Sequence, residues 1–367
     1  MLHQLTSDQF HNVQPLFADL SEHHLFCAGV LSGQYDGIVL ADDPDQPRSA
    51  FVFRPGMWAF LGGDAGNAPF VEALGAALSE KRYIGEKTGA LLCIVDSAEW
   101  EAVLHNLLPN REPIPTPRHL FIGSREQFNL PPDLPHGYTL HLINEALRQQ
   151  VQTDLPNDVQ QVLNLRKDKP DPDRHAFGMA ILHEGACVAW SMIDVIVGEH
   201  GDIGLFTKEA YRRRGLAAVV SGATIQYALA NGVTYVHWDV HSGNLASINL
   251  AKKHGLQFKS TYNQNMLLFG EVSYLANIAW NHLDAAEYAA TITRCRQLLT
   301  VEGGQMYGNF LLGAALAATG EPETAFTHLN LAIDHGMTDR FEWAMCQPLN
   351  ALHDSAEWEQ LMARLPE

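Results

Sequence analysis

The sequence is poor in cysteine, and the few cysteines it has form no motif. Five cysteines are spread over 367 residues, an odd number with no C-x-x-C pair, and each stands in apolar surroundings. This pattern indicates buried free thiols in a reducing compartment, and no local signature supports a catalytic cysteine. The five are Cys27, Cys93, Cys187, Cys295 and Cys346.

Basic residues are also scarce. The chain has 24 lysines and arginines against 42 aspartates and glutamates, so its formal net charge is -18. Binding of nucleic acid requires a positive footprint, and we therefore expect no nucleic-acid partner. A site for any other anion must be built locally, against the overall field of the protein.

Long apolar runs are missing as well. No stretch approaches the roughly 20 uninterrupted apolar residues of a membrane span, and the N-terminus lacks the basic segment and apolar core of a signal peptide. We therefore expect no membrane partner and a cytoplasmic location. With 46% apolar and 18% charged residues, the composition is that of a globular protein with a sizeable core.

The length favours two or three domains, and local composition suggests their boundaries. Prolines cluster from residue 113 to residue 135, which marks a boundary near 110–136. From about residue 271 the strand signals vanish and an alanine-rich helical periodicity begins. We predict an N-terminal α/β domain over 1–125, a second domain over 126–270 and an all-α domain over 271–367.

The first 125 residues mix helix and strand signals. A helix is predicted from Asp8 to Leu20, capped by Ser7 and kinked at Pro15. The remaining predictions are strands over 37–40, 50–53 and 91–96 and a helix over 69–79.

From Tyr138 the predicted elements follow a β-α-α-β-β-β-α-β-α-β-β order. They are a strand over 138–142, helices over 145–153 and 158–165, strands over 176–182, 186–195 and 201–206, a helix over 213–230, a strand over 233–240, a helix over 245–254 and two strands that finish at 258 and 268. Asn231-Gly232 and Gly255 supply the stops of the last two helices.

The C-terminal region carries the pattern of one helical hairpin. Small and apolar residues recur over 310–316 and 325–332, on either side of a Gly320-Glu321-Pro322 turn. The spacing resembles a tetratricopeptide repeat. One good repeat is fewer than the roughly three needed for independent stability, so we expect this tail to dock on the rest of the chain or on a protein partner.

The residues that indicate a chemical function lie where the predicted strand containing Asp202–Thr207 leads into the following helix. The turn reads Arg212-Arg213-Arg214-Gly215-Leu216-Ala217. Backbone N–H groups at a helix N-terminus, together with the helix dipole, form an anion site, and small residues let a pyrophosphate approach them. The alternative is a basic first turn on an exposed helix. Three arginines at a helix N-terminus oppose the dipole, however, and this anomaly favours a bound anion.

This turn resembles the signature of the GNAT superfamily of N-acetyltransferases, Arg/Gln-x-x-Gly-x-Gly/Ala after the fourth core strand. Arg212, Gly215 and Ala217 match it. A second landmark of the family, an asparagine eleven residues before a Gly-Phe, is met by Asn244 and Gly255, with a leucine in place of the phenylalanine.

The chain is most similar to the subgroup that contains zwittermicin A-resistance acetyltransferases, over residues 20–270. The likeness rests on Phe206-Thr207, Tyr211-Arg212, Gly215-Leu216-Ala217, Trp238-Asp239, Asn244-x-x-Ser247-x-x-x-Ala251-x-Lys253-x-Gly255 and, upstream, Asp36-Gly37, Asp42-Asp43 and Gly62-Gly63-Asp64. The resemblance implies an α+β fold, with a mixed, mostly antiparallel sheet flanked by helices. It also implies that the first half is a degenerate copy of the acetyltransferase core and helps to wall the acceptor site.

Acetyl-CoA is the co-substrate that the resemblance implies. The backbone of the turn would hold the pyrophosphate, the end of the preceding strand would pair along the pantetheine arm, and the start of the next helix would face it from the other side. The residues carried over are Leu205, Phe206, Thr207, Arg212, Arg213, Arg214, Gly215, Leu216, Ala217, Ala218, Asn244 and Ser247.

The acid and base of the reaction are less defined by the sequence. Attack of an amine on a thioester needs a base for the ammonium proton and a donor for the departing thiolate. Asp202 is the candidate base, because many relatives have a glutamate there. Many relatives also have a tyrosine at the position of Ala251, which cannot donate a proton. Ser247, Tyr262 and His241 are the candidates to replace it, unless the thiolate leaves unassisted.

The alternating His237-x-Asp239-x-His241 segment places three polar side chains on one face of a strand. Its alternatives are a metal site, a polar face near the cleft and a direct role for His241. Zinc would need a fourth ligand and a satisfied second shell, so we expect a polar face and no metal. Gly62–Gly66 lacks the order of a nucleotide-binding loop and is interpreted as a strand-turn-helix connection.

The predicted function is that of an acetyl-CoA-dependent N-acetyltransferase acting on a small-molecule amine. The acidic balance of the chain suggests a cationic acceptor, such as an aminopolyol or a polyamine-like metabolite. The alternative is a non-catalytic acyl-CoA-binding or helical-repeat interaction protein, motivated by Ala251 and the helical tail.

Overall fold

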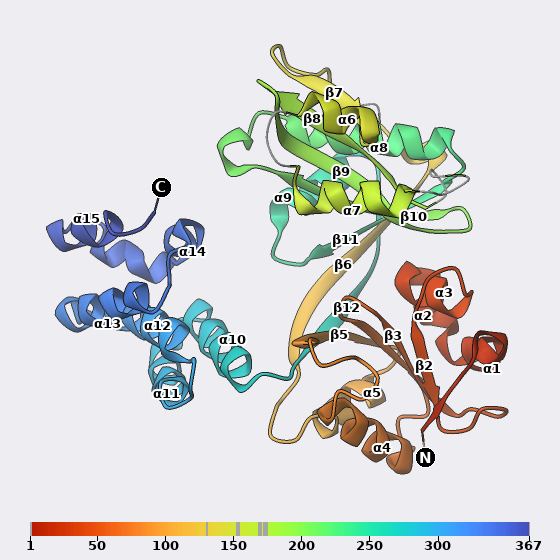
Figure 1. Ribbon diagram of the computed structural model, residues 1–367, viewed down its shortest axis with the longest axis horizontal. Helices are drawn as coiled ribbons and strands as arrows, with labels where there is room; N and C mark the ends of the chain where they lie inside the picture. Colours follow the sequence, from red (N-terminus) through yellow and green to blue (C-terminus); the bar gives the residue numbers. More distant parts are fainter. Residues whose placement is uncertain (1, 130, 152–154, 168–170, 172–174, 367) are drawn as a thin grey trace. The chain divides into compact units, whose positions relative to one another are not determined.

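The computed structural model describes residues 2–129, 131–151, 155–167, 171 and 175–366 (Figure 1). The chain forms two compact units. The first comprises Met1–Glu86, Leu91–Leu107 and Pro115–Met266, and the second comprises Lys87–Ala90, Leu108–Ile114 and Leu267–Glu367. No helix among the described residues is long and apolar enough to cross a membrane.

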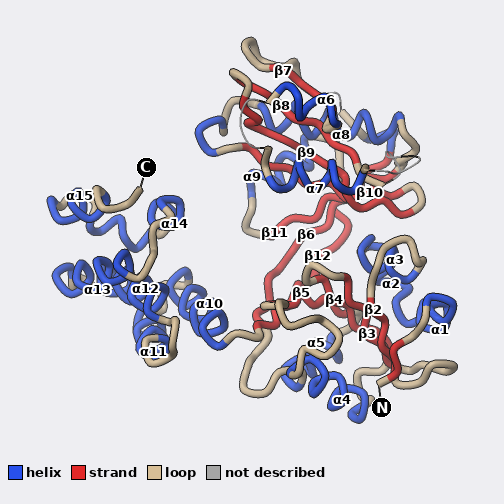
Figure 2. Tube along the Cα trace, in the orientation of Figure 1, coloured by secondary structure: helices blue, strands red, loops and turns tan. Residues whose placement is uncertain are grey.

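One mixed sheet of twelve strands organises the first unit, with the order β1-β2-β3-β4-β5-β12-β6-β11-β10-β9-β8-β7 (Figure 2). The strands of its first half are β1 His3–Gln4, β2 Ile38–Ala41, β3 Ser49–Arg54, β4 Trp58–Gly63, β5 Ala90–Val95 and β6 Ile114–Ser124. Those of its second half are β7 Thr139–Leu142, β8 Phe177–His183, β9 Ala186–Val197, β10 His200–Thr207, β11 Tyr235–His241 and β12 Gln257–Leu268.

The two halves repeat one another and exchange their last strands. In each half the second, third and fourth strands form an antiparallel meander, and the fifth strand lies parallel to the fourth. The sixth strand then crosses over, because β12 lies beside β5 and β6 lies beside β11 (Figure 1). This order supports the expectation of an α+β fold with a GNAT-like first half.

Helices pack with their apolar faces on both sides of the sheet. Those of the first half are η1 Ser7–Gln9, α1 Phe10–Val13, η2 Gln14–Phe17, α2 Ala18–His23, α3 Leu25–Leu31, α4 Ala68–Ser79, α5 Ala98–Val103 and η3 Leu104–Asn106. Those of the second half are η4 Arg125–Gln127, α6 Glu145–Gln150, α7 Asn157–Arg166, η6 Glu209–Tyr211, α8 Leu216–Ala230 and α9 Leu245–Lys253. In the second half α6 and α7 pack on one face of β8 and β9, and α8 packs on the other.

Helices cover both faces of the sheet, which explains the composition of β9. A strand buried on both faces reads as a continuous apolar run instead of an alternating one. All but three of its residues are buried, Asp194 being one of the exceptions. The hairpin that leads into β9 turns at Glu184 and Gly185, both with positive φ, as a two-residue type I′ turn requires.

The predicted N-terminal helix over 8–20 is wrong as a single helix. Instead η1, α1, η2 and α2 follow one another as short pieces, because Pro15 removes a backbone donor and clashes with the preceding turn. The cap is also one residue earlier than predicted. Thr6 and Gln9 form a capping box, with the Thr6 N–H donating to Gln9 Oε1 at 3.1 Å.

Other predicted boundaries also moved. The helix predicted over 213–230 begins at Leu216, since Arg213 and Gly215 both have positive φ, which a helix excludes. The two strands predicted near the end of this region are the single strand β12. The helix predicted over 145–153 is α6, and its predicted end at Thr153 lies outside the described residues. The five cysteines are buried free thiols, as predicted.

The second unit is built from helical hairpins. Its helices are α10 Glu271–Asp284, α11 Tyr288–Leu298, α12 Gln305–Ala318, α13 Pro322–Asp334, α14 Arg340–Met345, η7 Gln347–Leu352 and α15 Ala356–Met362. The central helix α12 is almost wholly buried and packs against α11 and α13. At Gly313 an added Cβ would lie 2.7 Å from the Leu329 side chain, so a small residue is required for this close approach.

Candidate active site

The turn between β10 and α8 has the backbone conformation of an anion-binding nest. Arg213 has φ +60° and Gly215 has φ +82°, with Arg214 between them. Positive φ in a non-glycine residue is uncommon and is retained where the surrounding structure imposes it. When residues of positive and negative φ alternate, their successive backbone N–H groups point towards one concave surface, which can bind an anion.

The N-terminus of α8 is open to a ligand. No side chain caps it, so the first N–H groups of the helix keep the positive end of the dipole exposed. A Cβ placed on Gly215 meets no protein atom within 4 Å. The space in front of this glycine therefore lies outside the protein, where a phosphate group would approach.

The arginines of the turn brace its backbone. Arg212 Nε donates to the Thr207 carbonyl at 3.3 Å, and Arg214 donates to the Ala210 carbonyl and to the Tyr138 hydroxyl, each at 2.9 Å. Arg213 is exposed to solvent. These cations create a local positive potential in a chain whose net charge is -18.

The strands β10 and β11 separate at the level of this turn. They pair in parallel at only three positions, His200–Tyr235, Gly201–Val236 and Asp202–His237. From Ile203 onward β10 keeps its pairing with β9 and has no partner residue in β11 over this described stretch. The edge of β10 over Leu205–Thr207 is therefore free to pair with an extended ligand, and Phe206 is exposed at its rim.

The helix α9 begins at the other side of this gap. The Asn244 side chain caps the helix by accepting from the Ser247 N–H at 3.1 Å. The Ser247 hydroxyl accepts from the indole N–H of buried Trp238 at 3.0 Å. Because the oxygen accepts this bond, the hydroxyl proton of Ser247 remains available for donation into the gap.

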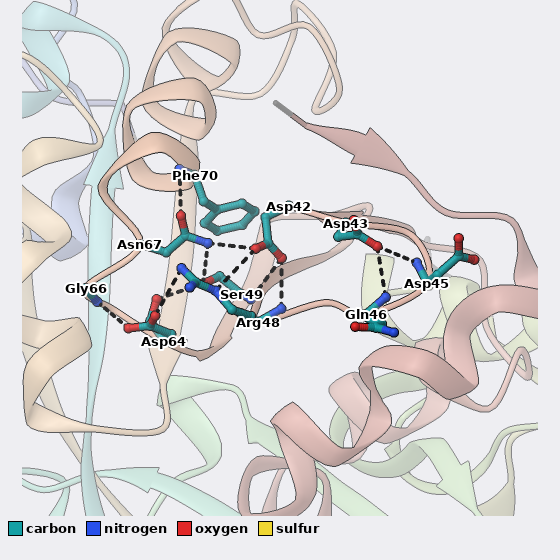
Figure 3. Close-up of polar contacts among 10 residues, drawn as sticks. All are labelled: Asp42, Asp43, Asp45, Gln46, Arg48, Ser49, Asp64, Gly66, Asn67 and Phe70. Atoms are coloured by element: carbon teal, nitrogen blue, oxygen red, sulfur yellow. Dashed lines mark hydrogen bonds and ion pairs between the residues drawn. The ribbon is translucent and has the colours of Figure 1, made fainter.

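The corresponding turn in the first half is filled by side chains (Figure 3). There the helix is α4, and its N-terminus is capped by Asn67, whose Oδ1 accepts from the Phe70 N–H at 3.4 Å. The Asn67 amide in turn donates to Asp42 Oδ2 at 2.8 Å and to Ser49 Oγ at 3.1 Å. The Asn67 side chain therefore occupies the N-terminus of α4, whereas the corresponding N-terminus of α8 has no side-chain cap.

Acidic groups surround that first-half turn. Asp42 accepts from the backbone N–H groups of Arg48 at 2.9 Å and Ser49 at 3.1 Å, and Asp64 accepts from the Gly66 N–H at 2.9 Å (Figure 3). A carboxylate beside a helix N-terminus satisfies the dipole and repels a further anion. The first half is thus a GNAT-like core in which side chains fill the helix start that has no side-chain cap in the second half.

A polar face lies on the side of β10 and β11 away from α8 and α9. Trp238 and Val240 pack into the core with these helices, so His237, Asp239 and His241 alternate to the opposite face. This segment forms a polar face. Among the described residues there is no cluster of three or more potential metal-ligating His, Cys, Asp or Glu side chains.

Asp239 is held by two partners that the sequence analysis did not select together. Arg118 Nε on β6 donates to Asp239 Oδ1 at 2.8 Å, and the Tyr262 hydroxyl on β12 donates to Asp239 Oδ2. His24 from the first half packs edge-on against the Tyr262 ring, with centroids 4.5 Å apart. This network joins both exchanged strands and α2–α3 around one carboxylate.

Asp202 stands at the point where the two strands part. Its carboxylate accepts from the backbone N–H of Ile203. Burial, and then the neighbouring Asp239 and Asp194, raise the pKa of Asp202 well above the usual carboxyl range. A carboxylate of raised pKa at the centre of a site is suited to accept a proton.

Asp202 lines a small cavity of about 10 Å³ formed between the two halves. Its second-half walls are Asp202, His237, Asp239 and Leu120. Its first-half walls are His23, His24, Leu25, Phe26, Trp58 and Phe60. The first half therefore contributes aromatic side chains to a site whose carboxylates come from the second.

The candidate proton donors lie in different environments. Tyr262 donates to Asp239 and is largely buried, and burial raises the pKa of its phenol. His241 is exposed at the end of β11, where its Nδ1 accepts from the Gly243 N–H at 3.1 Å. Ala251 is fully buried in the core beneath β11. Ser247 lies in the first turn of α9, where its hydroxyl oxygen accepts from the Trp238 indole N–H.

Sequence reasoning missed Arg118 and Asp194. Arg118 lies in a proline-punctuated segment that was interpreted as a boundary, and its partner Asp239 is 121 residues away. Asp194 lies opposite the register shift between Asp202 and Ile203, where β9 has one extra residue. A bulge depends on strand pairing, so no local sequence signal marks it.

Known proteins resemble the part of the chain that carries these features. A family model described as GNAT acetyltransferase matches residues 14–264. The uncharacterized N-acetyltransferase YdfB of Bacillus subtilis (strain 168) is 27% identical over 270 residues, which are 71% of this chain and 97% of the relative.

Solved structures agree in fold. A GCN5-related N-acetyltransferase-like protein from Streptococcus suis matches with a TM-score of 0.54 at 21% identity, covering 71% of this chain and 99% of the other. A GCN5-related N-acetyltransferase from Sphaerobacter thermophilus matches with a TM-score of 0.50 at 12% identity, covering 73% and 95%. The family model ends before α10, so the helices α10 to α15 of the second unit lie outside it. Over residues 14–264, which are more than half of its length, the chain belongs to the GNAT acetyltransferase family.

Proposed function

We propose that this protein transfers the acetyl group of acetyl-CoA to the amino group of a small molecule, by direct attack of the amine on the thioester. The observation that carries the proposal is the position of Asp202 on the strand that leads to the open nest at Gly215. A phosphate group at the nest and a pantetheine arm along Leu205–Thr207 would bring the thioester to the point where β10 and β11 part.

Asp202 acts as the base in this proposal. The attacking ammonium carries a proton that must leave before its nitrogen can attack, and a carboxylate of raised pKa is matched to that task. Ser247 acts as the donor to the departing sulfur, because its oxygen already accepts from Trp238 and its proton is free. His241, at the exposed end of β11, is the alternative donor.

The acceptor would place only its amino group at the cavity between the halves, because a volume of about 10 Å³ holds roughly one water molecule. The aromatic walls of the cavity include Phe26 and Trp58, whose rings stack with centroids 4.8 Å apart. The carboxyl group of Asp202 on the cavity wall favours a cationic ammonium group over an anionic one. We therefore propose a cationic amine as acceptor, in keeping with the acidic balance of the chain.

The finer assignments belong to the same proposal. The motifs from Phe206 to Gly255 support membership of the zwittermicin A-resistance-like subgroup. The α12–α13 hairpin with its small residues supports a tetratricopeptide-like tail that serves as a docking element. The buried free thiols support a cytoplasmic protein.

The test is release of free thiol from acetyl-CoA across a panel of primary amines, with the intact chain. Turnover that requires an amine, and whose product carries the acetyl group by mass spectrometry, supports the proposal. Asp202→Asn should lower kcat by about 10²-fold or more while leaving the Kd for coenzyme A unchanged. Tight coenzyme binding without turnover on any amine would favour a non-catalytic acyl-CoA-binding protein instead.

A further inference from the structure

Two histidines lie end to end beside the candidate base. His237 Nε2 and His200 Nδ1 are 2.9 Å apart, so they share one hydrogen bond. His237 is 1% exposed, whereas His200 is partly exposed at the first residue of β10. The Nδ1 of His237 is buried without a hydrogen-bond partner, as is that of His23, and both residues line the cavity that also contains Asp202.

Strand geometry puts these groups on one line. His200 pairs with Tyr235 and Asp202 pairs with His237 in the parallel ladder. Residues two apart on a strand share a face, so His200 and Asp202 stand on the same side, about 7 Å apart along β10. His237 is the ladder partner of Asp202 on the neighbouring strand, and its ring is hydrogen-bonded to His200.

We propose that His237 and His200 form a proton relay that carries the proton released at Asp202 out of the acceptor cavity to solvent. This inference rests on the proposed acetyl transfer. In that reaction a C–N bond forms and the C–S bond of the thioester breaks. The attacking ammonium starts with three N–H protons and the amide product keeps one, so one proton goes to the departing sulfur and one must leave the site.

Besides the carboxylates, the described groups on the cavity wall that can take up that last proton are His23, His24 and His237. The cavity volume of about 10 Å³ is that of roughly one water molecule. Asp239, the other carboxylate on its wall, already accepts from Arg118 and Tyr262. His237 is the cavity-lining group that also contacts a partly exposed proton carrier.

The two histidines are neutral in the resting protein. Burial lowers the pKa of His237 to about 4 and lowers the pKa of His200, so both rings are neutral at neutral pH. A neutral imidazole accepts a proton at one nitrogen and releases one from the other. At the outer end Tyr235 stacks on His200 with ring centroids 4.7 Å apart, and the charges of Glu199 and Glu22 oppose the effect of burial on the pKa of His200, so they stabilise a proton that arrives on this ring.

The experiment removes the outer relay residue and supplies a substitute from solution. His200→Ala should lower kcat by at least about tenfold in weakly buffered medium and should leave the Kd for coenzyme A unchanged. Added imidazole buffer should restore kcat towards the wild-type value in a saturable way. His141→Ala, which removes an exposed histidine of the edge strand β7, is the matched control and should respond to neither change.

A second variant distinguishes loss of proton transfer from a structural effect of the His200→Ala substitution. His237→Asn keeps a polar side chain at the buried position but cannot pass a proton between two ring nitrogens, so it should lower kcat and gain little from imidazole. Wild-type kcat for His200→Ala without imidazole, or an imidazole effect equal in wild type and variant, would overturn the relay. Absence of turnover in the wild-type protein would instead refute the proposed acetyl transfer itself.

Discussion

Replacing Gly215 by leucine tests the anion nest most directly. Gly215 has φ +82°, and a Cβ there meets no protein atom within 4 Å. The folded protein should therefore lose only the cost of holding an L-residue in the left-handed region, about 1–2 kcal/mol. The leucine side chain would project into the space in front of the N–H groups of Leu216 and Ala217.

The loss in binding should be larger than the loss in stability. A hydrogen bond to a charged group contributes about 1.5–3 kcal/mol. Loss of two such bonds to the pyrophosphate weakens binding by about 3–6 kcal/mol, which is more than about a hundredfold in Kd. Isothermal titration with coenzyme A measures the Kd, and thermal unfolding measures the stability.

Gly232 provides the matched control, because it follows the opposite end of the same helix. Its φ is +93°, and a Cβ there also meets no atom within 4 Å. Gly232→Leu should therefore cost the same folding free energy and leave coenzyme binding intact. Equal affinities of the Gly215→Leu and wild-type proteins would refute the assignment of the phosphate site to this turn.

Further outcomes are expected from the same geometry. Because its pKa is raised in the folded state, Asp202 binds its proton more tightly there than in the unfolded chain, so wild-type stability falls as the pH rises from the ordinary carboxyl range through the raised pKa. Thermal unfolding of Asp202→Asn should lack this fall and show a Tm at pH 8 at or above that of wild type; a lower Tm would contradict the burial of a charge. Arg118→Leu leaves Asp239 without its cation and should lower the free energy of unfolding by about 3 kcal/mol in urea titrations, whereas a change below about 1 kcal/mol would mark the pair as solvated. Calorimetry should find one coenzyme A per chain, because Asn67 closes the second candidate position; a stoichiometry of two would disprove that closure.

The sequence predicted most of the elements in the second half, because their apolar periodicity and helix stops are local. It misplaced the start of α8 because the arginines have good helix propensity, whereas the φ values of Arg213 and Gly215 belong to the nest. The first helix broke into pieces because the effect of Pro15 extended over several residues on either side of it. Both helix predictions failed because the backbone conformation of a few residues ended or interrupted the helix, and hydrophobic periodicity does not reveal that conformation.

The sequence by itself predicted residues 212–217 as the candidate phosphate site, because the pattern is local to a few consecutive residues, and the structure adds the positive φ of Gly215 and the uncapped start of α8. It also placed Asp202 on the strand that precedes this turn, which is β10. Only the tertiary structure shows which residues surround Asp239 and the cavity beside Asp202. The exchange of β6 and β12 brings Arg118 and Tyr262 to Asp239, and the first half supplies Phe26 and Trp58 to the cavity. Contacts between residues more than a hundred positions apart are selected by packing and strand pairing over the whole sheet, and no local pattern encodes them.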